Sequence, residues 1–259
     1  MKYIVYKSTL KPLVEPHQNV NISKNDAKKL INKYHTILLS YYSDFDISKE
    51  TSAWFVIKDS FGGMEELSSN TRNQVRKSLR MCEVRRITKE ELATDDGYYV
   101  YCKFTSNVNI SKYQFYENVL NMNDRELFGV FDKKSNKLIS YSQNLVGEAV
   151  EYKMIRANPD YYKTHYPFYS LFYKMNEYYL VERKKKYVND GFRILDNHSN
   201  IQDFLINKFK FRRAYCRINI YYKWYIKIII NIMYPFRSFV QVNSISKILK
   251  MEEIRRKCK

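Results

Sequence analysis

Residues 126–157 read ELFGVFDKKSNKLISYSQNLVGEAVEYKMIRA, and this stretch decides the fold. Its apolar and aromatic residues form three runs, at Leu127–Phe131, Leu138–Val146 and Ala149–Ala157. The polar segment Lys133–Asn136 separates the first two runs, and Gly147-Glu148 separates the second from the third. Short polar or glycine-containing segments between apolar runs are typical of turns. The stretch therefore predicts three consecutive strands, of which the first two pair as a hairpin.

The residues that follow alternate between helix and strand. Pro167 suits the first turn of a helix, because the fixed proline φ is helical and its missing N–H is not needed there. Tyr187–Asp190 is predicted as the next strand, Ile201–Phe209 as a short helix, and Arg212–Lys223 as a final strand. The order over residues 126–223 is thus strand, strand, strand, helix, strand, helix, strand.

Upstream of residue 126 the pattern is looser. Residues Thr71–Met81 are predicted to form a basic helix. Ser68-Ser69-Asn70 supply candidate N-caps for it, since serine and asparagine side chains accept hydrogen bonds from the free N–H groups at a helix start. The predicted elements are a strand at Tyr3–Tyr6, a helix at Asn25–Ser40, a loop at 43–52, a strand at Trp54–Ile57, the basic helix at Thr71–Met81, a strand at Glu83–Ile87 and a helix at 110–122.

These elements predict an α/β (α+β) protein with a mixed, largely antiparallel sheet flanked by helices. The chain has 259 residues but only 6 Gly and 5 Pro, which argues against long flexible linkers. We divide it into an N-terminal α/β lobe (1–125), a core (126–223) and a basic amphipathic C-terminal tail (224–259).

Charge points to an anionic partner. Lys and Arg number 45 against 27 Asp and Glu, a net charge of +18. Nucleic acid, a phosphorylated cofactor and an acidic membrane surface all fit such an excess. Residues 223–259 mix apolar, aromatic and basic side chains, with nine Lys or Arg against two Glu. The tail is either an interfacial helix on anionic lipid or a terminal helix packed on the core.

The cysteines indicate a reducing compartment. Cys82, Cys102, Cys216 and Cys258 form no C-x-x-C pair and have no accompanying histidine cluster, so no metal site is predicted. The N-terminus is too polar for a signal peptide, and no run of about 18 apolar residues is present. We expect a cytoplasmic protein, with peripheral contact at the inner face of the membrane if the tail binds lipid.

The order of elements over 126–223 resembles the core of GNAT acyltransferases. In that family acyl-CoA lies in a cleft beside a splayed strand, and its pyrophosphate binds at the N-terminus of the next helix, where free N–H groups and the helix dipole attract anions. The resemblance implies acyl-CoA (acetyl-CoA) as co-substrate, with no metal. The implied donor-binding residues are Tyr152, Met154 and Arg156 on the strand, and His165, Tyr166, Phe168, Tyr169 and Ser170 at the turn into the helix.

The segment 200–211, NIQDFLINKFKF, resembles a late motif of the same family, in which Asn200 would hold the pantetheine arm. Three departures accompany it. No glycine lies between Gly147 and Gly191, Lys210 occupies the position of a turn glycine, and Ile206 stands where the family often has a tyrosine acid. These departures are compatible with two alternatives: the acyl donor binds differently from the donor of the family, or the core is catalytically inactive.

Residues 67–80, LSSNTRNQVRKSLR, followed by Glu83–Arg86, are similar to the basic helix of Fem-type aminoacyl transferases. Those proteins lack the same glycine loop and move amino acids from aminoacyl-tRNA to cell-wall precursors, so the likeness implies tRNA as a partner. Arg72, Arg76 and Arg80 recur at four-residue spacing and share one helix face with Lys77 nearby. This face either clamps a phosphate or is simply solvated.

Four side chains are candidates for proton transfer. Asp190 ends a core strand beside Gly191 and is the candidate base for an attacking amine, with a turn aspartate as the alternative. Glu151 lies on the predicted splayed strand, and His198 precedes Asn200 by two residues. Tyr215, on the last strand, is the candidate acid in place of the missing tyrosine.

The sequence thus predicts an N-acyltransferase that moves an acyl group from an acyl thioester to an amine. The expected acceptor is a small molecule such as an amino sugar, or a cell-envelope precursor. Two alternatives stay open: a Fem-like transferase that uses aminoacyl-tRNA, and an inactive GNAT-like module that binds nucleic acid or anionic membrane. The sequence does not indicate the oligomeric state.

Overall fold

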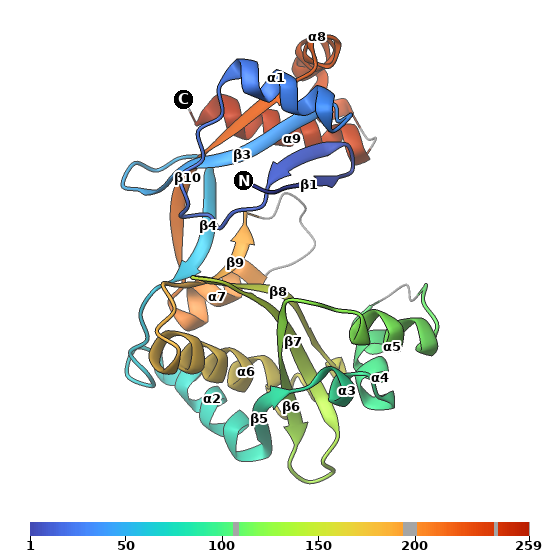
Figure 1. Cartoon of the computed structure of the whole chain (residues 1–259). Helices are drawn as coiled ribbons and strands as arrows, with labels where there is room; N and C mark the ends of the chain where they lie inside the picture. The colour runs from blue at the N-terminus through green and yellow to red at the C-terminus, as the bar shows by residue number, and fades with distance from the viewer. Residues whose placement is uncertain (106–108, 194–200, 241–242, 259) are drawn as a thin grey trace. The chain divides into compact units, whose positions relative to one another are not determined.

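The computed structural model describes residues 1–105, 109–193, 201–240 and 243–258 (Figure 1). Its described part contains ten strands with helices around them. The chain forms two compact units that are interleaved in sequence. The first is built from Met1–Val56, Arg213–Lys259 and the segment that begins at Phe192, and the second from Ile57–Gly191 and the segment that ends at Arg212.

The second unit contains the three strands that the sequence predicted. Its sheet has the order β9-β8-β7-β6-β5, in which β5, β6, β7 and β8 run antiparallel and β8 and β9 run parallel. The strands are β5 (Cys82–Ile87), β6 (Arg125–Asp132), β7 (Leu138–Val146), β8 (Val150–Ala157) and β9 (Val188–Phe192). The predicted hairpin of the first two strands is therefore confirmed, and the third strand pairs antiparallel with the second.

Helices cover both faces of this sheet. Tyr141 and Ser142 are neighbours on β7, so their side chains point to opposite faces. Tyr141 packs in a core with residues of three helices: α3 (Lys89–Leu92), α4 (Asp95–Phe104) and α5 (Lys112–Leu120). On the other face, Ser142 contacts Met175 of α6 (Pro167–Asn176), against which α2 (Ser69–Met81) packs (Figure 1). The predicted division after residue 125 falls inside this unit, directly after the first residue of β6.

The remaining elements of the second unit complete its periphery. The helix α6 continues into η2 (Glu177–Glu182), which is π-helical, and η1 (Pro159–Tyr161) is a single 3-10 turn before it. The helix α7 spans Ile201–Phe209, as predicted. Ser68 caps α2, because its side chain accepts from the N–H of Thr71.

The first unit has a sheet of order β1-β2-β3-β10-β4. Its strands are β1 (Tyr3–Tyr6), β2 (Thr9–Pro12), β3 (Leu38–Ile47), β4 (Ala53–Lys58) and β10 (Arg212–Tyr222). The helix α1 (Lys24–Lys33) covers it, and Ala27 and Ile31 of α1 share a core with Leu10, Leu39 and Tyr41. The C-terminal elements are α8 (Trp224–Met233), η3 (Tyr234–Phe239) and α9 (Asn243–Lys257).

Two predictions in the first unit are wrong. The helix expected over Asn25–Ser40 ends at Lys33, where Tyr34 caps it and His35 adopts a left-handed φ of 51°. The first half of the loop expected at 43–52 belongs to the strand β3, which ends at Ile47 and pairs antiparallel with β10. The pairing of Tyr42 with Ile218 joins residues far apart in sequence, so a local pattern did not reveal it. Among the described helices, none has the length and apolar character needed to cross a bilayer.

Candidate functional site

The strands β8 and β9 part soon after they meet. Their parallel ladder consists of the pairs Val150–Val188 and Glu151–Asn189. On its other side β8 stays paired with β7 as far as Ala157. The edge of β8 after Glu151 therefore extends beyond its ladder with β9, at the place where the sequence predicted a splayed strand.

A β-bulge sits at the point of divergence. Tyr152 pairs with Asn144 of β7 and Met154 with Gln143, so Lys153 is an extra residue in β8. A bulge changes the face to which the following side chains point. Because Asn144 and Gln143 are neighbours on β7, Tyr152 lies on one face of the sheet, whereas Met154 lies on the other.

Tyr152 is part of the packed interior next to α6. Its hydroxyl donates to Asn176 Oδ1 at 2.8 Å, and its ring lies 5.9 Å from that of Phe172. Burial raises the pKa of Tyr152 well above its usual value, with smaller contributions from Tyr179 and Asp190. A tyrosine held in this way keeps its proton and acts as a packing residue.

Arg156 is held on the opposite face by α4. It pairs across the ladder with Tyr141, and its guanidinium carbon lies 4.5 Å from the ring centroid of Tyr101. Its Nη1 also donates to the hydroxyl of Thr105. The predicted donor-binding set on β8 is thus divided between the two faces of the sheet, with Tyr152 on one and Met154 and Arg156 on the other.

Asp190 and Glu151 come together at the end of the short ladder. Asn189 shapes the turn, because its Nδ2 donates to Val150 O at 3.0 Å and its Oδ1 accepts from Gly191 N at 2.9 Å. Gly191 has a φ of 81°, which a residue with a side chain rarely adopts. A Cβ at Gly191 would lie 3.5 Å from Glu151 Oε1, so this carboxylate borders the turn.

The environment of Asp190 suits proton transfer near neutral pH. Burial raises the pKa of Asp190 to about 7, and the negative charge of Glu151 adds to the rise, while a hydrogen bond from Gln202 opposes it. Lys153 Nζ lies 2.5 Å from Glu151 Oε1 and keeps Glu151 paired. A carboxylate with a pKa close to the working pH is an effective general base.

The turn into α6 offers few free N–H groups. Tyr166 has a left-handed φ of 52°, and no side chain caps the helix. Pro167 has no N–H, and the N–H of Tyr169 already donates to Tyr166 O at 2.9 Å. An ordinary helix N-terminus has four N–H groups without helical partners. This one therefore has less capacity to bind a pyrophosphate.

Other residues of this turn make contacts within the protein. His165 Nε2 lies 3.3 Å from Asp132 Oδ1, and its Nδ1 lies 2.8 Å from Thr164 Oγ1. The ring of Phe168 packs against Tyr162, and that of Tyr169 packs edge-on against Phe204 at 5.1 Å. Aromatic side chains thus surround the start of α6.

The basic helix α2 lies directly against this turn (Figure 1). Ser78 Oγ donates to Tyr166 O at 3.0 Å and to Ser170 Oγ at 2.8 Å. Lys77 Nζ lies 5.0 Å from the centroid of the Tyr166 ring. The structure therefore brings two predicted phosphate-binding features together, although almost ninety residues separate them in sequence.

The arginine face of α2 is open. Thr71, Val75 and Ser78 are its buried residues, whereas Arg76 and Arg80 are exposed. Within the described part of the chain, Arg72, Arg76, Lys77 and Arg80 form no ion pair. The predicted one-sided distribution of charge is thus present, and no described carboxylate neutralises it.

The structure treats the three remaining candidates differently. Tyr215 belongs to the first unit, where its ring meets that of Trp54 edge-on at 6.3 Å. His198 and Asn200 lie outside the described residues, so their predicted roles stay predictions.

The sequence interpretation missed a row of buried polar side chains under α6 and η2. Asn144 Nδ2 donates to Tyr179 Oη at 3.2 Å, and Tyr179 Oη donates to Glu126 Oε2 at 3.2 Å. Tyr179 stands in η2, and π-helical turns are frequent at functional sites. Ser140, Ser142 and Asn144 recur at every second position of β7, which is the signal that would have revealed the row.

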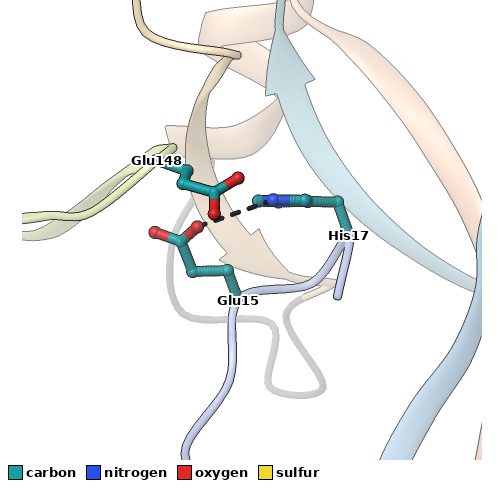
Figure 2. Close-up of side chains that lie close together, drawn as sticks. All are labelled: Glu15, His17 and Glu148. Atoms are coloured by element: carbon teal, nitrogen blue, oxygen red, sulfur yellow. Dashed lines mark ion pairs between the residues drawn. The ribbon is translucent and has the colours of Figure 1, made fainter. Parts of the chain in front are cut away.

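A separate titratable pair lies in the first unit. His17 Nε2 is 3.7 Å from Glu15 Oε2, in the segment between β2 and α1 (Figure 2). The contact is an ion pair when His17 is protonated.

Comparison with known proteins identifies the fold. No family model matches the chain, and no curated protein does. The structure of L-PGS from Bacillus licheniformis is similar with a TM-score of 0.54 and 10% identity, over 99% of this chain and 86% of that one. FemX is similar with a TM-score of 0.51 and 12% identity, over 74% of this chain and 75% of that one.

A tandem GNAT protein from the clavulanic acid biosynthesis pathway has a TM-score of 0.45 and 11% identity, over 83% of this chain and 75% of that one. The chain has a GNAT-like fold with likeness to Fem-type proteins. At these identities the comparisons establish the fold alone, so the chemistry has to be argued from the site.

Proposed function

We propose that this protein is an N-acyltransferase, which moves an acyl group from an activated ester or thioester to an amine. The observation that carries the proposal is Asp190, a carboxyl group with a pKa of about 7 at the point where β8 and β9 part. An amine has to lose a proton to become a nucleophile, and a base with this pKa takes that proton near neutral pH. The GNAT-like fold is consistent with the assignment.

The proposed reaction has three parts. Asp190 takes a proton from the substrate ammonium, and the free amine attacks the acyl carbonyl. The new C–N bond forms, the bond to the leaving oxygen or sulfur breaks, and the second amine proton passes to the leaving group. N–H groups on the edge of β8 beyond Glu151 would stabilise the negative oxygen of the intermediate.

Two donors fit different parts of the site. Acyl-CoA would place its pyrophosphate at the α6 turn, where Pro167 lacks an N–H and the Tyr169 N–H is already used. Aminoacyl-tRNA instead has an extended phosphate backbone, which suits the open arginine face of α2 beside that turn. We therefore favour aminoacyl-tRNA as the donor and keep acyl-CoA as the second candidate. The proposed acceptor is the amine of a small molecule or of an envelope precursor.

The test measures transfer of a labelled acyl group to a panel of amines and amino sugars, from either aminoacyl-tRNA or acetyl-CoA. We expect product from aminoacyl-tRNA, and we expect Asp190→Asn to lower the rate by about 10² or more, since general-base catalysis contributes about 10²–10⁴. The matched control is Asp203→Asn, which removes the same charge from an exposed position on α7 and should keep full activity.

Three results would change the assignment. Product from acetyl-CoA alone would make acyl-CoA the donor. Binding of tRNA without transfer to any amine would favour an inactive module that binds nucleic acid. An Asp190→Asn variant as active as Asp203→Asn would exclude Asp190 as the base.

A further inference from the structure

The outward face of α8 is apolar from end to end. Trp224, Ile228 and Ile232 recur at four-residue spacing and so share one side of the helix. Their exposed fractions are 71%, 51% and 64%. Tyr225 and Ile229 widen the same side and are also exposed. Helices on the surface of a globular protein normally carry polar residues on this side.

The exposed stripe does not end with α8. Phe236 and Phe239 of η3 are 62% and 80% exposed, so the apolar surface continues into the following turn. We call the set the α8 surface; it consists of Trp224, Tyr225, Ile228, Ile229, Ile232, Phe236 and Phe239. Contiguous apolar surfaces of this kind mark contact sites.

The inner side of α8 is held in place by the first unit. Ile230 is 4% exposed and lies roughly opposite Ile228 on the helix. Arg256 of α9 donates from Nη2 to Asn231 Oδ1 at 2.9 Å, and its guanidinium carbon lies 3.8 Å from the Tyr234 ring centroid. Ile230 thus marks the buried side of α8, and Arg256 of α9 holds the C-terminal end of the helix through Asn231 and Tyr234.

Positive charge borders the apolar stripe. Lys223 precedes α8 and Lys227 lies on its first turn, and neither forms an ion pair with another described residue. Residues 223–259 as a whole have a net charge of +7. An apolar stripe with tryptophan, tyrosine and phenylalanine, bordered by lysine, has the composition of helices that lie in the interface of anionic membranes.

We propose that the α8 surface lies on a bilayer that contains anionic phospholipid, with the helix axis parallel to the membrane plane. The ten residues of α8 span about 15 Å, half of the roughly 30 Å hydrocarbon core, so α8 is too short to cross it. A second copy of the chain fits less well, because it would present the same positively charged surface, whereas anionic headgroups are complementary to the bordering lysines. This inference is independent of the proposed acyl transfer.

The test uses Trp224 as the reporter. The chain has two tryptophans, so a Trp54→Phe variant leaves only Trp224. We expect its fluorescence to shift to shorter wavelength, and the protein to sediment, with vesicles of phosphatidylglycerol and phosphatidylcholine in equal parts. Vesicles of phosphatidylcholine alone should bind about tenfold or more weakly, since each basic residue near an anionic surface contributes about 1 kcal/mol.

The decisive variant is Ile228→Asp/Ile232→Asp, which places two charges in the apolar stripe and should reduce vesicle binding by at least about tenfold. The control Tyr113→Asp/Val181→Asp adds the same charge at exposed apolar positions of the second unit and should bind as the parent does. Equal loss in both variants, or no vesicle binding by the parent, would overturn the proposal. So would a parent dimer, measured by light scattering without vesicles, that becomes monomeric in the Ile228→Asp/Ile232→Asp variant.

Discussion

The helices α2 and α8 each have a buried and an exposed side, but their exposed sides differ in chemistry. In α2 the buried side contains Val75 and Ser78, and the arginines point outward. In α8 only Ile230 is buried, and the exposed side is apolar with lysines at its border. We therefore propose that the two regions serve two kinds of partner. An open arginine face suits a polyanion in water, whereas an apolar face bordered by lysine suits a lipid surface.

The largest expected effect is on tRNA binding by the arginines of α2. Arg72→Gln/Arg76→Gln/Arg80→Gln should weaken tRNA binding by about tenfold or more and lower the slope of log affinity against log salt by about two, because each phosphate contact contributes about 0.7–0.9 to the slope. Vesicle binding should stay within about twofold. Filter binding over a salt series and vesicle sedimentation measure the two effects.

The matched control for this prediction is Lys28→Gln/Lys29→Gln/Lys33→Gln on α1, which removes the same charge from another helix. If both triple variants lose tRNA affinity equally, binding follows net charge, and α2 has no special role. If the α2 variant also stops binding vesicles, the two helices do not have separate partners.

A difference in pH dependence is also expected, because the proposed transfer site contains Asp190, whereas the residues that define the α8 surface include no carboxyl group and no histidine. Acyl transfer should rise with pH through an inflection near 7, as Asp190 loses its proton. Glu151→Gln removes a negative charge that raises the pKa of Asp190, so the inflection should move to lower pH. Vesicle binding through α8 should not change over this range. An unmoved inflection in Glu151→Gln would assign the titration to another group.

The same carboxyl group predicts a pH effect on stability. The pKa of Asp190 is raised from 3.8 to about 7 by folding. The folded state therefore binds the proton more tightly, and the stability gained in this way is complete below pH 3.8 and is lost as pH rises through 7. Urea unfolding at pH 5 and pH 8 should show a larger loss for the parent than for Asp190→Asn. Equal losses would contradict the raised pKa.

The smallest expected effect is on stability, through the hydrogen bonds that fix α2 against the turn into α6. Ser78→Ala removes the hydrogen bonds to Tyr166 O and to the Ser170 hydroxyl and should cost about 1–2 kcal/mol in the free energy of unfolding. Because Lys77 lies over the Tyr166 ring, tRNA affinity should also fall slightly. Ser69→Ala, at an exposed position of the same helix, is the control and should be near neutral. A Ser78→Ala variant as stable as that control would show that packing alone places α2.

Local patterns explain why some elements were predicted well. The strand β7 has the predicted bounds Leu138–Val146, because a polar turn and Gly147-Glu148 delimit an apolar run. The basic helix α2 was predicted from its serine caps and its four-residue charge spacing. In contrast, the strand β3 was missed because its partner β10 is distant in sequence, and α4 was not predicted at all. Tyr98 and Tyr101 of α4 become partly buried only when α3 to α5 pack on Tyr141.

The sequence by itself determined the strand and helix order of residues 126–223, the separate basic faces and the identity of the candidate base, because periodicity, turn composition and charge are local properties. Only the tertiary structure decided which of these features meet. The register of β8 with β9 places Glu151 next to the turn that contains Asp190, and the bulge at Lys153 divides Tyr152 from Met154. Register and packing depend on contacts between residues that are distant in sequence. Burial at such contacts raises the pKa of Asp190. Packing likewise decides which side of α8 is buried, and it is the apolar side with Trp224, Ile228 and Ile232 that stays exposed.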